Sequence, residues 1–197
     1  MLHFPFEPTN RALFLAINAP ADLSGVSLTF AMMASNYFVL VLAALVLWAW
    51  IRRQPLERRW LLTVAIAALL ALSLNTLIGM LAPHPRPFMV PIGHTFIPHD
   101  PETSFPSDHA TLMWTFAWGL YGLPALRRIG YVALVLAAFT SWSRVFLGVH
   151  FPFDMAGSMV VAVISLMLVR PWQPWIDARL APLAERLHVS TLGKWYK

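Results

Sequence analysis

Five stretches of this sequence contain no Asp, Glu, Lys or Arg. They run over residues 23–51, 60–85, 109–126, 129–143 and 155–169. A membrane-spanning helix needs about 20 mostly apolar residues, with a range of about 17–25. The first two stretches meet this length directly, and the other three come near it when tolerated flanking residues are included. We therefore predict five spans, which lie at 24–50, 60–82, 107–123, 127–143 and 152–169.

The composition supports a membrane protein. Hydrophobic residues make up 58% of the chain and charged residues only 12%, whereas a soluble domain has about 25% charged residues. Five buried helices in a soluble protein would need more polar surface than this chain has. The predicted fold class is all-α, an integral membrane helical bundle of about five transmembrane helices. Residues 1–170 would form one membrane domain and residues 171–197 a cytoplasmic amphipathic tail.

The basic residues lie between particular spans. With five spans, three basic regions fall on one side of the membrane, which the positive-inside rule makes the cytoplasmic side. This placement explains the net charge of +5 as a topology signal that can also contact anionic lipid, and it argues against a nucleic-acid partner. The basic residues are Arg52, Arg53, Arg58 and Arg59 after the first span, Arg127 and Arg128 after the third, and Arg170, Arg179, Arg186, Lys194 and Lys197 after the fifth.

Shorter helices are predicted at both ends of the chain. Residues 9–19, with Thr9 or Asn10 as the helix cap, are too short to span and predict an interfacial or re-entrant helix on the non-cytoplasmic side. The N-terminus lacks a basic region and carries Glu7, so no signal peptide is predicted. The tail predicts an amphipathic helix, because its apolar residues recur at spacings of four, four, three and four. They are Trp172, Ile176, Leu180, Leu183 and Leu187.

Two polar loops are predicted to meet on the non-cytoplasmic side. Residues 83–106 contain seven prolines, which favours an extended loop over a helix. This loop joins the second and third spans, and residues 144–151 join the fourth and fifth. Because both loops lie opposite the arginine-rich regions, they could build one site over the helix bundle.

The ionisable groups at this face are suited to phosphoryl transfer. Two arginines can hold a phosphate group bidentately, and helix N-termini add backbone N–H groups. Two histidines can divide the nucleophile and general-acid roles, with a carboxylate that orients one of them. With two arginines on the phosphate oxygens, neither a cofactor nor a metal is required, and the absence of cysteine excludes thiolate ligands. The candidate residues are Arg86, Ser107, Asp108, His109, Arg144, His150 and Asp154.

Each candidate also has a structural interpretation. Asp154 and Ser107 could only cap helices, and Arg86 and Arg144 could be interface residues whose charged ends reach water. We interpret His84, His94 and His99 as loop histidines outside catalysis. No role is assigned to Glu102, and the role of Asp108 stays open at this point.

Three ordered motifs resemble those of a known family. "RP" at 86–87, "PSDH" at 106–109 and the pattern SR-x5-H-x3-D over 143–154 resemble the signature motifs of the type 2 phosphatidic acid phosphatase (PAP2) superfamily. This family includes lipid phosphatases, glucose-6-phosphatase and vanadium haloperoxidases. The resemblance extends over roughly residues 20–170. The sequences of the motifs are most similar to those of small bacterial undecaprenyl pyrophosphate phosphatases.

The resemblance implies a role for each candidate. His150 would attack phosphorus and form a phosphohistidine, and Asp154 would orient it. His109 would protonate the leaving group and then activate water. The phosphate would be held by Arg86, Ser107 and Arg144, with backbone N–H groups near Asp108.

The sequence departs from the family pattern at two positions. The first motif normally begins with a lysine seven residues before its arginine, and Gly79 stands there, with no other lysine before residue 194. The glycine usual in the second motif is Asp108. A carboxylate there should repel a phosphate dianion unless it is protonated, turned away or paired.

The expected function is hydrolysis of undecaprenyl pyrophosphate at the outer face of the bacterial cytoplasmic membrane. The partners would then be this polyprenyl pyrophosphate and membrane lipids, and the activity would recycle the lipid carrier of cell-wall synthesis and could confer bacitracin tolerance. The first alternative is the same chemistry, or phosphotransfer, on phosphatidylglycerophosphate, phosphatidate or lipid A. The second is an anion transporter or channel. No feature of the sequence predicts the oligomeric state.

Overall fold

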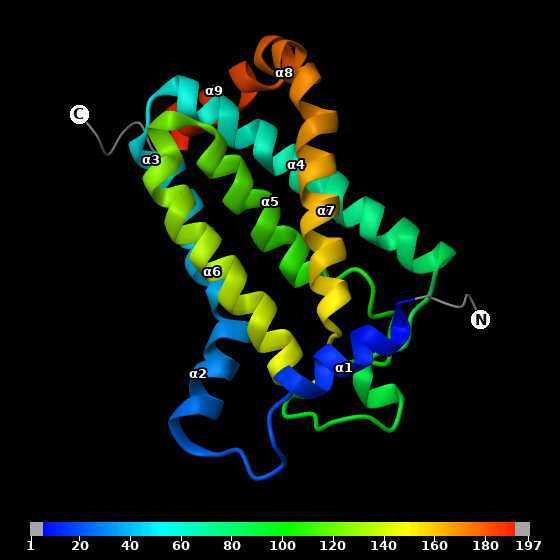
Figure 1. Cartoon of the computed structure of the whole chain (residues 1–197). Helices are drawn as coiled ribbons and strands as arrows, with labels where there is room; N and C mark the ends of the chain where they lie inside the picture. Colours follow the sequence, from blue (N-terminus) through cyan, green and yellow to red (C-terminus); the bar gives the residue numbers. More distant parts are fainter. Residues whose placement is uncertain (1–5, 192–197) are drawn as a thin grey trace.

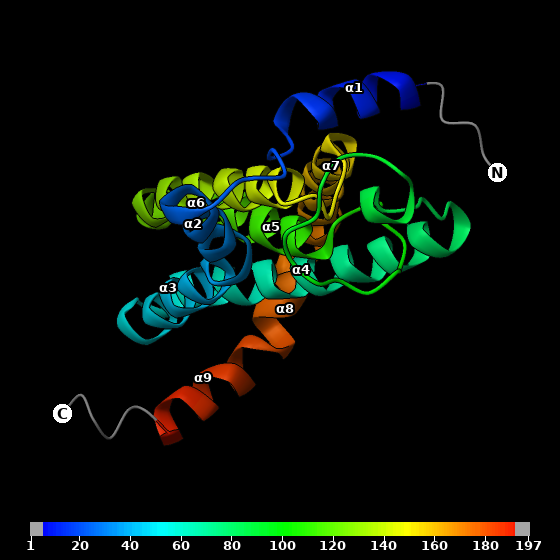
Figure 2. The ribbon, with the colours of Figure 1, turned by 90° about the horizontal axis from the view of Figure 1, so that it is seen from below.

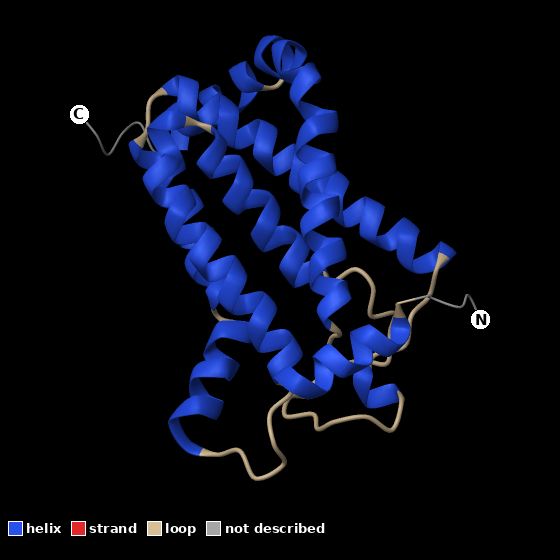
Figure 3. Cartoon of the chain, viewed as in Figure 1, coloured by secondary structure: helices blue, strands red, loops and turns tan. Residues whose placement is uncertain are grey.

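The computed structural model describes residues 6–191, and this range consists of helices and loops without a strand (Figures 1 and 3). The predicted all-α fold is therefore confirmed. The α-helices are α1 (Glu7–Ile17), α2 (Gly25–Asn36), α3 (Phe38–Arg52), α4 (Pro55–Leu81), α5 (Asp108–Gly122), α6 (Arg127–Phe146), α7 (Pro152–Val169), α8 (Gln173–Arg179) and α9 (Ala181–Thr191).

Several of these helices are long and apolar enough to cross a membrane. Within residues 6–191, three segments meet that requirement, Pro55–Leu81, Pro124–Phe146 and Pro152–Arg179. The pair α2 and α3, bent by 47° at its break, would be a fourth. The predicted span 107–123 corresponds to α5, whose 15 residues extend only about 22 Å at about 1.5 Å per residue. The membrane bundle is confirmed, and the number of five spans stays a prediction.

Helix α5 lies at the centre of the bundle and packs against α4, α6 and α7 (Figure 1). Small residues permit this close packing. A Cβ atom on Gly119 of α5 would lie 2.6 Å from a methyl carbon of Val64 on α4. Gly130 of α6 lies directly against the backbone of Tyr121. Most of α5 is buried for this reason, and its first residues become the floor of the site described below.

The two polar loops meet at the same end of the bundle, as predicted. The Phe96 N–H donates to the Leu147 carbonyl at 3.1 Å, and the Thr95 hydroxyl donates to the Gly148 carbonyl at 3.3 Å. Gly148 has a φ of 80°, and a Cβ atom there would overlap the carbonyl group of His94. Only glycine fits this contact, because its backbone is in the left-handed region. The arginine-rich connections lie at the opposite end, near α8 (Figure 1).

The N-terminal helix begins earlier than predicted. It starts at Glu7, with Pro8 in its first turn, a position that proline favours. The predicted cap at Thr9 or Asn10 is wrong. Asn10 is buried instead, and its Oδ1 atom accepts a hydrogen bond from the Phe153 N–H at 3.0 Å. This bond ties α1 to the first turn of α7, and Figure 2 shows α1 lying across that end of the bundle.

The tail is helical but is divided into α8 and α9. Ile176 is buried beside Ala67 of α4, while Trp172, Leu183 and Leu187 are exposed. Arg58 of α4 holds α9 through two hydrogen bonds to the Glu185 carboxylate, at 2.8 and 2.7 Å. Lys194 and Lys197 lie outside the described residues.

Candidate active site

His150 occupies the loop between α6 and α7 and is almost completely buried. Its Nδ1 atom lies 3.0 Å from the Ser104 carbonyl oxygen and 3.3 Å from Asp154 Oδ2. Because a carbonyl oxygen only accepts, these contacts assign the proton to Nδ1 and leave a lone pair on Nε2. Burial lowers the pKa of His150 to about 3, with Asp154 opposing and the two arginines Arg144 and Arg86 reinforcing the shift. At neutral pH the ring is therefore a neutral imidazole.

Asp154 combines the two roles that the sequence left open. It lies in the first turn of α7, where Oδ2 accepts a hydrogen bond from the Phe151 N–H at 2.7 Å. That contact caps the helix. The same oxygen faces Nδ1 of His150, four residues earlier. The helix start thus fixes the carboxylate in the position from which it orients the histidine.

Ser104 and Ser158 support this pair and were missed in the sequence. The Ser104 hydroxyl donates to Asp154 Oδ2, so Ser104 contacts both members of the pair. The Ser158 hydroxyl on α7 lies 2.8 Å from the Asp154 carbonyl and accepts from the Ser107 N–H at 2.9 Å. Both serines are buried. Neither serine is part of a recognisable sequence motif, so their position at the site is seen only in the folded structure.

The three residues of the segment 107–109 have different positions: the first caps α5, and the other two line the site. Ser107 is the N-cap of α5, and its side chain accepts from the Ala110 N–H at 3.5 Å. It is buried, which favours its structural interpretation. Asp108 and His109 face the cavity instead. Asp108 Oδ1 accepts a hydrogen bond from the Asn75 amide at 2.8 Å, so the additional carboxylate is paired.

The two predicted phosphate-binding arginines are buried, and their charged ends do not reach the surface as those of interface residues would. Arg86 donates to the carbonyl groups of Glu102 and Val149, each at 3.2 Å. Its Nη1 atom also lies 3.0 Å from His150 Nε2. Arg144 donates from Nη1 to the Ser35 hydroxyl at 3.3 Å. Within residues 6–191, Nε and Nη2 of Arg144 have no hydrogen-bond partner. A buried cation with open donors is suited to an anion.

A cavity of about 400 Å³ joins these groups. Of the predicted site residues, Arg86, Asp108, His109, Arg144 and His150 line it, whereas Ser107 and Asp154 do not. The lining residues are Asn75, Thr76, Gly79, Met80, Arg86, His99, Glu102, Thr103, Pro106, Asp108, His109, Arg144 and His150.

Of the three loop histidines, His99 is the one that reaches the cavity. Its ring centre lies 6.1 Å from that of His150. Burial lowers the pKa of His99, and the charges of Arg86 and Arg144 lower it further. His84 instead contacts Glu7 at 3.1 Å, and His94 is exposed. The proline-rich loop has no periodic pattern, so the sequence could not predict that His99 would reach the cavity and that the other two histidines would not.

Gly79 also lines the cavity, and its surroundings explain the first departure from the family pattern. A Cβ atom at this position would lie 2.6 Å from the Thr103 methyl carbon. The Thr103 hydroxyl in turn accepts from the His84 N–H at 3.1 Å. Thr103 therefore packs against α4 at the position where the family motif has a lysine.

Comparisons with known proteins agree with this geometry. The model of the PAP2 superfamily matches residues 60–177. YbjG of Escherichia coli (strain K12), by its name a candidate undecaprenyl-diphosphatase, is 37% identical over 97% of this chain and 92% of its own length. The undecaprenyl-diphosphatase BcrC of Bacillus subtilis (strain 168) is 32% identical over 95% of this chain and 96% of its own length.

Solved structures show the same fold. The crystal structure of LpxE from Aquifex aeolicus has a TM-score of 0.63 at 24% identity and covers 81% of this chain and 93% of its own. A PAP2-type phosphatidylglycerolphosphate phosphatase from Bacillus subtilis has a TM-score of 0.56 at 22% identity, with 89% of each chain covered. With the family model covering more than half of the chain, these matches show that the chain is a membrane phosphatase of the PAP2 superfamily.

Proposed function

We propose that the chain hydrolyses undecaprenyl diphosphate to undecaprenyl phosphate and inorganic phosphate. The observation that carries this proposal is the position of His150, whose Nε2 lone pair faces the cavity while Nδ1 faces Asp154 and the Ser104 carbonyl. The names of the two relatives that match nearly the whole chain supply the lipid.

In the first step, Nε2 of His150 attacks the terminal phosphorus atom, and the bond from that phosphorus to the bridging oxygen breaks. Undecaprenyl phosphate leaves with the bonding electrons, and His109 donates a proton to it. The positive charge on the phosphorylated imidazole is stabilised by Asp154. Arg86 exchanges its contact with Nε2 for the phosphate oxygens, and Arg144 supplies its open donors.

In the second step, His109 removes a proton from a water molecule, which attacks the phosphorus of the phosphohistidine. The phosphorus–nitrogen bond breaks, and Nε2 regains its lone pair as inorganic phosphate leaves. No net proton is gained by either histidine over the cycle. His109 lies at the first turn of α5 and lines the same cavity as His150, which is the placement that this shared use requires.

The proposed location is the bacterial cytoplasmic membrane, with the cavity facing the exterior or periplasm. The arginine-rich connections lie at the bundle end opposite the two polar loops (Figure 1), which agrees with a cytoplasmic placement of that end. Residues 1–170 would be the membrane phosphatase domain and 171–197 its cytoplasmic tail. Hydrolysis there would recycle the cell-wall lipid carrier and confer bacitracin tolerance. A bacitracin transport permease protein BcrC of Bacillus licheniformis, 29% identical over 68% of this chain, matches the sequence as well.

The test is phosphate release by the purified protein in detergent with EDTA. The substrates are undecaprenyl diphosphate, phosphatidylglycerophosphate and phosphatidate. We expect preference for undecaprenyl diphosphate, loss of release in His150→Ala, and full activity in His94→Ala, a control for an exposed loop histidine. Preference for another lipid would overturn the substrate. Activity retained by His150→Ala would overturn the mechanism.

A further inference from the structure

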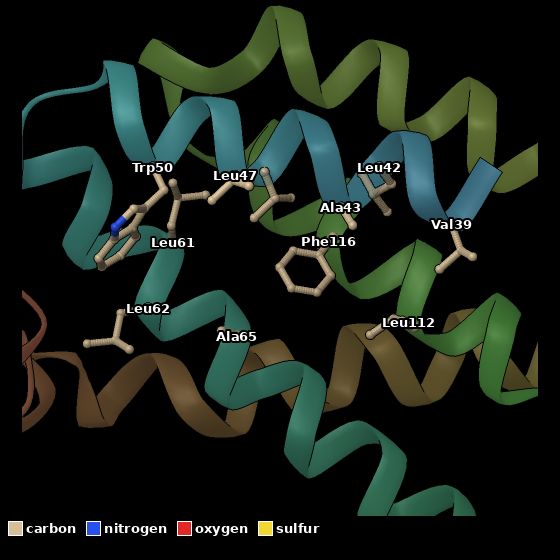
Figure 4. A pocket seen from close by; sticks show the side chains of 11 residues that line it. Val39, Leu42, Ala43, Leu47, Trp50, Leu61, Leu62, Ala65, Leu112 and Phe116 are labelled. Carbon is tan, nitrogen blue, oxygen red and sulfur yellow. The ribbon is translucent and has the colours of Figure 1, made fainter. Parts of the chain in front are cut away.

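An apolar groove of about 340 Å³ lies between α3, α4 and α5 (Figure 4). It is separate from the catalytic cavity, with which it shares no lining residue. All of its lining side chains are aliphatic or aromatic. The lining residues are Val39, Leu42, Ala43, Val46, Leu47, Trp50, Leu61, Leu62, Ala65, Leu112 and Phe116.

One end of the groove approaches the catalytic residues along α5. His109, Leu112 and Phe116 are spaced by three and four residues, so they lie on one face of the helix. Between Ala110 and Ala117, only Leu112 and Phe116 are partly exposed, and all the remaining residues of α5 are buried in the bundle. The face of the helix that carries His109 therefore continues directly into the groove, over about 10 Å of helix.

Helix α4 shows the same continuity. Thr76 lines the catalytic cavity, and Ala65 lines the groove. Leu72 lies between them on the same face, at spacings of seven residues from Ala65 and four from Thr76. On two neighbouring helices, residues of the polar cavity and residues of the apolar groove therefore lie on one helix face.

We propose that this groove binds the polyprenyl chain of the lipid diphosphate whose headgroup occupies the catalytic cavity. This inference rests on the proposed function. The chain of a substrate held by Arg86 and Arg144 beside His109 can leave along the face of α5 that carries Leu112 and Phe116, which the bundle buries only in part. That face ends at Leu112 and Phe116, inside the groove (Figure 4).

The shape of the groove favours a single prenyl chain over a diacyl phospholipid. It is one channel, which Figure 4 shows extending from Val39 and Leu112 at one end to Trp50 and Leu62 at the other. The small side chains of Ala43 and Ala65 keep it open. Because lipid tails are as apolar as the groove, binding gains little from the hydrophobic effect and depends on close packing. The groove would therefore select by the fit of a branched chain.

The experiment fills the groove and varies the length of the chain. Ala65→Trp places an indole in the groove, and Ala138→Trp, at an exposed alanine of α6 outside the lining, is the matched control. The substrates are undecaprenyl diphosphate and isopentenyl diphosphate, whose single isoprene unit cannot reach Ala65. Ala43→Phe on the opposite helix is a second, independent groove variant.

We expect both groove variants to lower kcat/KM for undecaprenyl diphosphate by about tenfold or more and to leave isopentenyl diphosphate unaffected. Ala138→Trp should change neither value. Equal kcat/KM for the long substrate in wild type and both groove variants would overturn the proposal, and so would an equal loss on both substrates. If the wild type hydrolyses no prenyl diphosphate, the proposed function fails and this inference fails with it. If the wild type hydrolyses prenyl diphosphates but the groove variants show no loss specific to the long substrate, only the assignment of the groove fails.

Discussion

Nη1 of Arg86 lies 3.0 Å from Nε2 of His150. The arginine can only donate, so it occupies the lone pair that the proposed reaction uses. A bound phosphate group would draw the guanidinium away from the nitrogen and toward its own oxygen atoms. In the proposed mechanism, this arrangement would couple exposure of the nucleophile to arrival of the anion, and it would make His150 a poor nucleophile toward anything that Arg86 does not bind.

Removing the Ser104 hydroxyl should weaken catalysis without abolishing it. Ser104→Ala deletes the hydrogen bond to Asp154 and keeps the backbone carbonyl that faces His150 Nδ1. A hydrogen bond to a charged group contributes about 1.5–3 kcal/mol, so we expect kcat to fall by roughly 10- to 100-fold. Ser104→Thr, which retains a hydroxyl, should recover part of the activity. Phosphate-release kinetics would measure both, and wild-type kcat in Ser104→Ala would show that Asp154 does not need this support.

The contact between α1 and α7 should contribute to stability. Asn10→Ala removes the acceptor for the Phe153 N–H in the first turn of α7, and loss of such a cap costs about 0.5–2 kcal/mol. For a chain of this size, about 1 kcal/mol corresponds to a fall in Tm of about 2–4 °C. Thermal unfolding in detergent would measure it. Asn36→Ala, at an exposed helix end, should leave Tm nearly unchanged, and equal Tm values for the two variants would refute the anchoring role.

Gly79 and Thr103 should show strong coupling. A Cβ atom at position 79 meets the Thr103 methyl group, so Gly79→Ala should lower Tm. Thr103→Ser removes only that methyl group and keeps the hydroxyl that accepts from the His84 N–H. The double variant should therefore be more stable than Gly79→Ala alone. A double-mutant cycle of Tm values would measure the coupling, and additive effects would mean that the two side chains are independent.

The buried His150 should make the protein less stable in acid. Its pKa is about 3 in the folded protein, against an ordinary value of 6.5. Between these values the unfolded chain binds more protons, so stability falls as pH decreases below about 6.5, by up to about 1.4 kcal/mol per pH unit. His99 shifts in the same direction. We expect the fall in Tm between pH 7.5 and pH 5 to be smaller in His150→Gln and smaller again with His99→Gln added. Parallel Tm curves for all three proteins would contradict this account.

The residues that the motifs singled out could be placed from the sequence because charge decides which side of the membrane each loop occupies. His150 and Arg86 are 64 residues apart in the sequence and lie in different loops. The arginine-rich connections alone predict that both loops lie on the same side of the membrane. Ser104, Ser158 and Asn75 could not be predicted. Their roles depend on contacts with Asp154, Ser107 and Asp108 that no spacing encodes.

The bend between α2 and α3 was not predicted. Residues 23–51 carry no charge and contain neither proline nor a glycine other than Gly25, although the polar pair Ser35 and Asn36 lies at the break. The cause lies in another helix, since the Thr140 hydroxyl on α6 donates to the Ala34 carbonyl near the break. A side chain that enters the helical hydrogen-bond ladder in this way can bend it. Tertiary contacts of this kind are visible only in the folded chain.

The shortness of α5 has a consequence for the surrounding lipid. Its 15 residues extend about 22 Å, whereas the hydrocarbon core of a bilayer is about 30 Å thick. His109 at its start would therefore lie below the headgroup plane of an undistorted bilayer. If α5 spans the bilayer as predicted, the membrane would thin around this end of the protein, or the diphosphate would sink to meet it. We therefore expect the thickness of the host membrane to affect turnover through the length of this one helix, independently of any residue that touches the substrate.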